Sequence, residues 1–228
     1  MKHGFIVTKV SLTQHPLSEA AAAGIGLAAF VVIVLDVGWR IIRHGTVMAH
    51  EGAHAVLGSL LFRNVSGIEL HADATGATSF ATGGGCLGNV IVAFVGYVGP
   101  SLFGLGAARL IEFGHVVAVL WVLLFLLGIL LIGLRRSFGL ITVILVGGVV
   151  FLVVHLTPAG AQLGAAYGIT WLLLLSAVRR VVEIGVTSSD GANLRSLTGI
   201  PHLLWFLFWL AATLAAVAVG GSMLVLRH

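Results

Sequence analysis

The sequence predicts an all-α polytopic membrane protein with about seven transmembrane helices and one short β-hairpin. Three observations predict this fold: an apolar composition, a series of long apolar runs, and a polar stretch with strand-like composition. Of the 228 residues, 59% are hydrophobic and 9% are charged, and the mean hydropathy is +1.12. Soluble domains carry about 25% charged residues, so a soluble globule is excluded. Disorder needs low hydrophobicity, and a disulfide-built module needs more than the single Cys86.

Apolar runs of transmembrane length define the organisation of the chain. A bilayer span needs about 20 mostly apolar residues. The candidate spans are 17–39, 41–62, 86–108, 115–134, 137–157, 162–184 and 202–225. We therefore expect an N-terminal tail and first anchor at 1–40, a core at 41–201, and a C-terminal transmembrane helix at 202–228.

The Lys and Arg residues predict an orientation, because cytoplasmic loops are enriched in both. One set of alternate loops holds Lys2, Lys9, Arg63, Arg135, Arg136, Arg179, Arg180 and Arg195, and the other holds Arg40, Arg43, Arg109 and Arg227. Eight against four predicts a multi-pass cell-membrane protein, surrounded by the lipid bilayer, with a cytoplasmic N-terminus. The basic residues form no clustered stripe, so nucleic acid is not an expected partner.

Two polar stretches interrupt the apolar pattern. In the first, Val65–His71 and Ala77–Thr82 have strand-like composition and flank the turn residues Asp73–Gly76, which predicts a hairpin at about 65–82. The second stretch is the loop 187–201, which precedes the last span. These stretches are where we expect polar chemistry to meet the membrane helices.

The second span carries the pattern His-Glu-x-x-His, formed by His50, Glu51 and His54. Residues four apart share one face of a helix, so both imidazoles can reach one ion while Glu51 points to its edge. This spacing is typical of a zinc hydrolase, in which the glutamate is the general base that deprotonates a metal-activated water. Ionisable groups in mid-span are costly, so their presence indicates a function.

A catalytic zinc site usually has a third protein ligand. The candidates outside the motif are Glu19, Asp36, Glu69, Asp73, Glu112, Glu183, Asp190, His71, His115, His155 and His202. Asp190 is the preferred one, since it has no arginine at helical spacing and precedes Gly191, which lets the backbone fold closely around an ion. The other candidates stay open at this point.

Other polar or helix-breaking residues have simpler interpretations. Asp36 lies four residues before Arg40, and Glu183 lies four residues after Arg179, spacings that predict ion pairs within a helix. Pro100 lies inside a span, which predicts a kinked or interrupted helix beside the metal site.

Three motifs resemble the site-2 protease family of intramembrane zinc metallopeptidases, and its compact bacterial branch in particular. They are the HEGAH motif with His50, Glu51 and His54, the Gly-Pro run from Gly96 to Gly104, and Asp190-Gly191. The resemblance implies that His50, His54 and Asp190 hold Zn²⁺. It also implies that Glu51 is the catalytic base. The family has Asn and Pro before its Asp-Gly, where this chain has Thr187–Ser189.

The resemblance also implies that the hairpin helps to present the substrate, a membrane-embedded protein whose unwound segment could add to it as a strand. Ile68, Leu70 and Thr78 are the candidate contacts in the hairpin. Asn193 and His202 are candidates for stabilising an oxyanion.

The expected function is that of a zinc metalloendopeptidase of the site-2 type, which hydrolyses peptide bonds of membrane-spanning or membrane-proximal proteins in regulated intramembrane proteolysis. Two alternatives are a metal-binding membrane scaffold or regulatory protein that does not cleave, and a metal-ion transporter. Glu51 argues against both, because neither needs a general base beside its ligands. The sequence has no internal repeat of the kind that transporters show, and it does not predict an oligomeric state.

Overall fold

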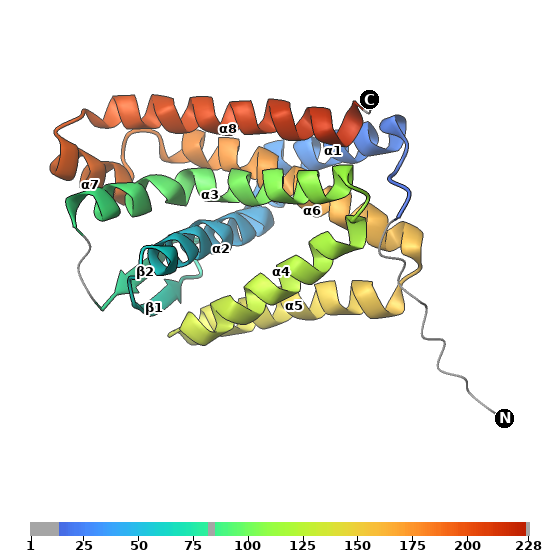
Figure 1. The fold of residues 1–228 in the computed structure, drawn as a ribbon, viewed down its shortest axis with the longest axis horizontal. Helices are drawn as coiled ribbons and strands as arrows, with labels where there is room; N and C mark the ends of the chain where they lie inside the picture. The colour runs from blue at the N-terminus through green and yellow to red at the C-terminus, as the bar shows by residue number, and fades with distance from the viewer. Residues whose placement is uncertain (1–13, 82–84, 227–228) are drawn as a thin grey trace.

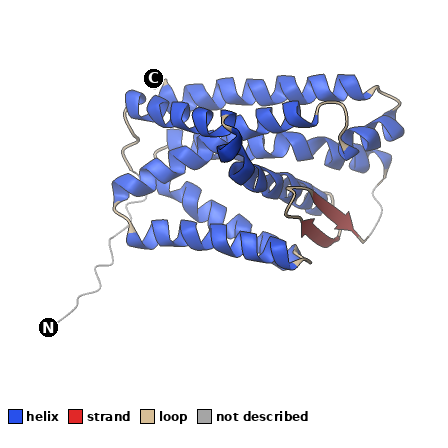
Figure 2. Cartoon of the chain, turned by 180° about the vertical axis from the view of Figure 1, so that it is seen from behind, coloured by secondary structure: helices blue, strands red, loops and turns tan. Residues whose placement is uncertain are grey.

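The computed structural model describes residues 14–81 and 85–226, which form mostly helices and one small sheet (Figures 1 and 2). In chain order the elements are α1 (Glu19–Val34), α2 (Asp36–Leu60), β1 (Val65–Leu70), β2 (Gly76–Phe80), α3 (Cys86–Glu112), α4 (Val116–Gly133), α5 (Ser137–Leu156), α6 (Ala159–Ile184), α7 (Ser189–Thr198) and α8 (His202–Val225). Four residues with predicted topological or strand roles lie outside the described residues: Lys2, Lys9, Thr82 and Arg227.

The seven membrane spans expected are not confirmed, since the described residues form five or six candidate spans. Five described helices are long and apolar enough to cross a bilayer alone: α3, α4, α5, α6 and α8. α1 and α2 qualify only as a pair, bent by 100°, which raises the count to six at most. The reason is physical: α1 has only 16 residues, fewer than the roughly 20 that a span needs, and α2 is rich in charged and histidine side chains.

The bend between α1 and α2 is held by α6. Arg179 of α6 pairs with Asp36 at 3.0 Å, and its guanidinium lies 4.9 Å from the centre of the Trp39 ring. It also donates a hydrogen bond to the carbonyl of Ile33 at the end of α1. The predicted pairing of Asp36 with Arg40 is therefore wrong, because an arginine from another helix takes the carboxylate.

Glu183 has different partners from the one that its spacing predicts. Its carboxylate pairs with Arg180 at 2.9 Å and accepts a hydrogen bond from Trp39 Nε1 at 3.0 Å. The predicted pairing with Arg179 is wrong, since that arginine faces the α1–α2 bend. Trp39 of α2 thus contacts both Arg179 and Glu183 of α6, the helix that leads to the second polar stretch.

α3 lies in the middle of the helix bundle and packs against α2, α6, α7 and α8 (Figure 1). Small residues make this possible, since Gly96, Gly99 and Gly104 let neighbouring side chains approach its backbone closely. The helix is continuous from Cys86 to Glu112, so Pro100 does not interrupt it. The loss of one backbone donor at that proline is tolerated inside the surrounding helices.

The predicted hairpin is confirmed. β1 and β2 pair antiparallel, with Leu70 opposite Gly76 and a bulge between Val65 and Gly67. The outer edge of β1 is covered by the α4–α5 connection, where the Arg135 N–H donates to the Ile68 carbonyl at 3.0 Å. In the described part of the chain, no strand pairs with the outer edge of β2.

The side chains of the hairpin divide between the core and the site. Ile68 and Leu70 are only 2% and 3% exposed and pack in an apolar cluster with Val47, Leu130 and their neighbours. Ile68 and Leu70 therefore belong to the core, whereas the Thr78 side chain on β2 faces α2. The two strands thus have different surroundings, and β2 is the one that meets the metal motif.

Candidate metal centre

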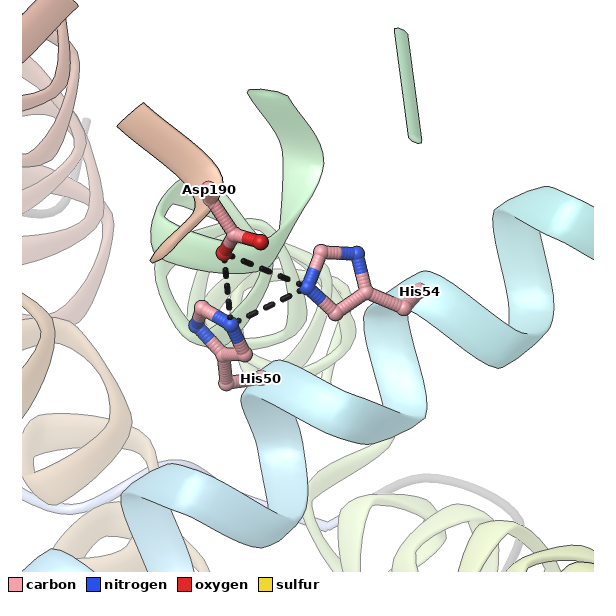
Figure 3. A group of neighbouring side chains, drawn as sticks. All are labelled: His50, His54 and Asp190. Carbon is pink, nitrogen blue, oxygen red and sulfur yellow. Dashed lines mark hydrogen bonds and ion pairs between the residues drawn. The ribbon is translucent and has the colours of Figure 1, made fainter. Parts of the chain in front are cut away.

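Three side chains from two distant parts of the chain converge in the interior (Figure 3). His50 Nε2 lies 3.0 Å from His54 Nε2, and Asp190 Oδ2 lies 3.1 Å from the first and 3.4 Å from the second. The two histidines lie one helical turn apart on α2, and the aspartate comes from the first turn of α7. The structure thus brings together the three residues that the sequence singled out as metal ligands.

The spacing of these three atoms fits a tetrahedral metal ion. Zinc binds His nitrogen and carboxylate oxygen at about 2.0–2.1 Å, so two ligands of a tetrahedral site lie about 3.3 Å apart. The three observed separations, 3.0, 3.1 and 3.4 Å, surround that value. Two imidazoles and one carboxylate are also a donor set that a catalytic zinc accepts, with one position left for water or substrate.

The hydrogen bonds of His54 prepare it to bind a metal. Its Nδ1 lies 2.8 Å from the carbonyl oxygen of Val92 on α3, and a carbonyl can only accept, so Nδ1 carries the proton. In the neutral imidazole, the form that binds a metal, Nε2 is then the unprotonated atom, and it faces His50 and Asp190. The His50 ring is supported on another side by Tyr97, edge-on at 4.6 Å between centroids.

Glycines on α3 give the two histidines their room. A Cβ at Gly96 would lie 2.5 Å from His54 Nε2 and 2.6 Å from His50 Nε2, and a Cβ at Gly99 would lie 2.2 Å from that of Ala53. Real side-chain carbons do not approach so closely, so any larger residue would push α2 and α3 apart. The Gly-Pro segment is therefore the neighbour of the metal site that the sequence led us to expect.

Asp190 is placed by the local structure of α7. Ser188 caps the helix by accepting the Gly191 N–H, and the carboxylate lies in the first turn, where the helix dipole favours negative charge. Burial raises the pKa of Asp190, but in the metal-free protein hydrogen bonds from the protonated rings of His50 and His54 and their charges outweigh that effect and hold the pKa below its usual range. The group is thus a carboxylate, the form that binds metal.

Glu51 lies beside the cluster but is not one of its three members. It is 4% exposed, and its Oε2 accepts a hydrogen bond of 2.7 Å from the Thr78 hydroxyl on β2. A Cβ at Gly76 would lie 2.8 Å from Glu51 Oε1, so β2 also encloses the carboxylate sterically. From the sequence alone, Thr78 is only a candidate substrate contact. Its contact with Glu51 joins residues that are far apart in the sequence, so no sequence pattern predicts it.

The other candidate ligands lie elsewhere. In the described ranges, the three residues above are the one group of three His, Cys, Asp or Glu side chains whose ligand atoms converge. Glu69 pairs with Arg136, Asp73 accepts from Thr75, and Asn193 is exposed. His202 contacts the α7 N-terminus without joining the cluster.

The His, His and Asp group, mostly shielded within a bundle of apolar helices, is a candidate metal centre of a membrane protein. The model of the Peptidase M50B-like family matches residues 23–220. The chain therefore belongs to this family, which is the site-2 protease family of intramembrane metallopeptidases. Searches of curated proteins and of solved structures found no match.

Proposed function

We propose that this protein is an intramembrane zinc endopeptidase of the site-2 type. The observation that carries the proposal is the position of Glu51, a buried carboxylate next to two histidines and an aspartate that fit one metal ion. A bare binding site or a scaffold has no use for such a group, whereas hydrolysis needs a base within reach of the metal. The family membership supports the same reading.

His50, His54 and Asp190 are the residues that would hold zinc. When bound, zinc supplies Lewis acidity, which lowers the pKa of water to about 7 and polarises a carbonyl. Glu51 then accepts the proton of the attacking water and passes it to the leaving amine. The Thr78 hydrogen bond holds the Glu51 carboxylate in one orientation, so the base is already positioned before the reaction.

The substrate that fits this site is a membrane-spanning or membrane-proximal polypeptide segment. Carbonyls in a transmembrane helix are already hydrogen-bonded, so the segment must unwind before it is cut. The outer edge of β2 could bind the unwound segment, because its backbone groups can pair with an extended chain next to Glu51.

The orientation that we propose places the hairpin on the cytoplasmic side. The arginines on the hairpin side of the bundle are Arg63, Arg135, Arg136, Arg179, Arg180 and Arg195. If α1 and α2 form one span, Arg109 at the C-terminal end of α3 lies on the other side of the bundle from these six. The predicted cytoplasmic N-terminus requires α1 and α2 to cross separately. Labelling of a cysteine introduced at Asp73 from the external side alone would contradict the proposed orientation.

The test of the activity compares wild type with Glu51→Gln in two assays, zinc content and cleavage of a transmembrane peptide. Glu51→Gln should keep the metal and lose cleavage, because the amide cannot accept the proton. The matched control is Glu112→Gln, which removes an exposed carboxylate paired with Arg109. Equal cleavage by wild type and Glu51→Gln would refute the general base, and bound zinc without Glu51-dependent cleavage of any peptide would favour the scaffold.

A further inference from the structure

The helix that carries Asp190 is tied at its N-terminus to the first residue of α8. Ser188, the N-cap of α7, is buried, and its Oγ accepts the Gly191 N–H at 3.0 Å. The same oxygen lies 3.1 Å from His202 Nε2. A serine hydroxyl has one donor and two acceptor positions, so it makes both contacts at once. Ser188 therefore joins the start of α7 to His202.

The imidazole of His202 also lies directly against the backbone of α7. A Cβ added at Gly191 would lie 1.7 Å from His202 Nε2, so only glycine leaves room for the ring. Gly191 follows Asp190 in the first turn of the helix. The ring therefore limits where the backbone beside the carboxylate can lie.

A row of aromatic rings connects His202 with the other half of the metal centre. His202 meets Trp209 edge-on with centroids 6.3 Å apart, Trp209 lies 4.5 Å from Tyr97, and Tyr97 lies 4.6 Å from His50. Trp209 is 1% exposed, and its Nε1 donates to the Phe94 carbonyl at 2.9 Å, which fixes the middle of the row. His202 consequently has a rigid support behind it.

We propose that His202 is a positioning residue that holds Asp190 against His50 and His54 and thereby sets the metal affinity of the centre. Its Nε2 is engaged by Ser188, and it is not one of the three convergent ligands. The inference rests on the part of the proposed function that makes Asp190 a ligand. The ring of His202 packs against α7, and its Nε2 also holds Ser188, the residue that caps α7 next to Asp190.

The test measures the affinity of the purified full chain for Co²⁺, from its visible absorption in competition with a chelator. His202→Phe keeps an aromatic ring against Trp209 but removes Nε2. Affinity should fall by about 10- to 100-fold, the usual cost of losing a group that orients a ligand. The wavelengths of the cobalt bands should stay unchanged, because the three ligands remain.

A double-mutant cycle with Asp190→Ala separates positioning from general damage. If His202 acts through Asp190, His202→Phe should change Co²⁺ affinity by less than about 2-fold in the Asp190→Ala background. Ser188→Ala should weaken binding in the wild-type background, and Ser188→Asp, which retains a capping oxygen, should restore part of it. His155→Phe is the matched control, since this exposed histidine stacks on Phe151 away from the site, and should have no effect.

Three results would overturn the inference. An equal loss in both backgrounds would mean that His202 only maintains the packing. Shifted cobalt bands in His202→Phe would make His202 a ligand itself. Unchanged affinity in His202→Phe, or in Asp190→Ala, would remove the positioning role, and neither result bears on the requirement for Glu51, which is measured by cleavage.

Discussion

Two glycines beside the metal centre and two glycines of α4 and α5 have opposite surroundings. Gly96 on α3 and Gly191 on α7 have histidine rings where a Cβ would be, whereas Gly128 on α4 and Gly148 on α5 have open space. Half of the most apolar part of α3 is buried, against 17% of that of α5. An apolar groove of about 1110 Å³ separates α4 from the face formed by α2 and α3.

This difference shows where close approach is needed. Polar ligands from α2 and α7 can converge beside α3 only if the backbones come together, and glycine makes that possible. α4 and α5 need only an apolar surface, because lipid is as favourable a neighbour as another side chain. The comparison therefore predicts that equivalent changes will have very different effects in the two regions.

The largest expected effect is that of Gly96→Ala. The new methyl group would meet both metal-motif imidazoles, so His50 and His54 must move and metal affinity should fall by at least about 10-fold. Gly128→Ala on α4 should leave affinity unchanged and stabilise the helix by about 0.5–1 kcal/mol, since its Cβ enters open space. Chelator competition and thermal unfolding measure the two effects. Equal metal affinities in the two variants would break the comparison.

Metal binding should rigidify one region only. At a free zinc concentration 100 times the Kd, binding adds about 2.7 kcal/mol to the stability of the folded state. Hydrogen exchange should slow in α2 and α7, which supply the ligands, and stay unchanged in α4 and α5. Slowing of the same size in α5 would show that the two regions respond as one unit.

A smaller effect is expected at the hairpin strand that meets Glu51. Thr78→Val keeps the shape of the side chain but removes the 2.7 Å hydrogen bond to the carboxylate. A hydrogen bond to a charged group contributes about 1.5–3 kcal/mol, so kcat should fall by about 10-fold or more while zinc content is unchanged. Ser79→Ala, an exposed neighbour on the same strand, is the control. If KM rises and kcat is unchanged, Thr78 contacts the substrate and does not orient Glu51.

The smallest effect is expected at the exposed tip of the hairpin. The Thr75 hydroxyl and backbone N–H donate to Asp73 Oδ1 at 2.7 and 3.0 Å, which lowers the pKa of Asp73 below its ordinary value. Because the folded pKa is depressed, this stabilisation is present above the unfolded pKa and is lost as pH falls through the folded one. Thr75→Val should raise the pKa of Asp73 toward about 3.9 in a carboxyl NMR titration. An unchanged pKa would assign the shift to other groups.

Local patterns predicted the parts of the molecule that depend on spacing. His50 and His54 lie four apart on one helix, so their convergence follows from helix geometry. The hairpin followed from strand-like runs around a turn, and the convergence of Asp190 with the histidines agrees with the family motif. The site-2 family itself is confirmed by the family model.

Features that depend on tertiary contacts could not be predicted in this way. The 100° bend after α1 leaves α1 and α2 as one candidate span at most, and apolar runs alone do not reveal the bend. Asp36 has Arg40 at ideal helical spacing but pairs with Arg179, which is far away in the sequence. In the same way, the bond between Thr78 and Glu51 joins two elements whose contact is set by packing.

The most direct test of the central claim is the coordination of zinc in the purified protein, measured by X-ray absorption at the zinc edge. We expect two imidazoles and carboxylate or water oxygens at about 2.0–2.1 Å. Asp190→Ala should keep both imidazoles while the affinity for zinc falls. A third imidazole in the wild type, or an Asp190→Ala variant that binds zinc as tightly as wild type, would contradict a centre built from His50, His54 and Asp190.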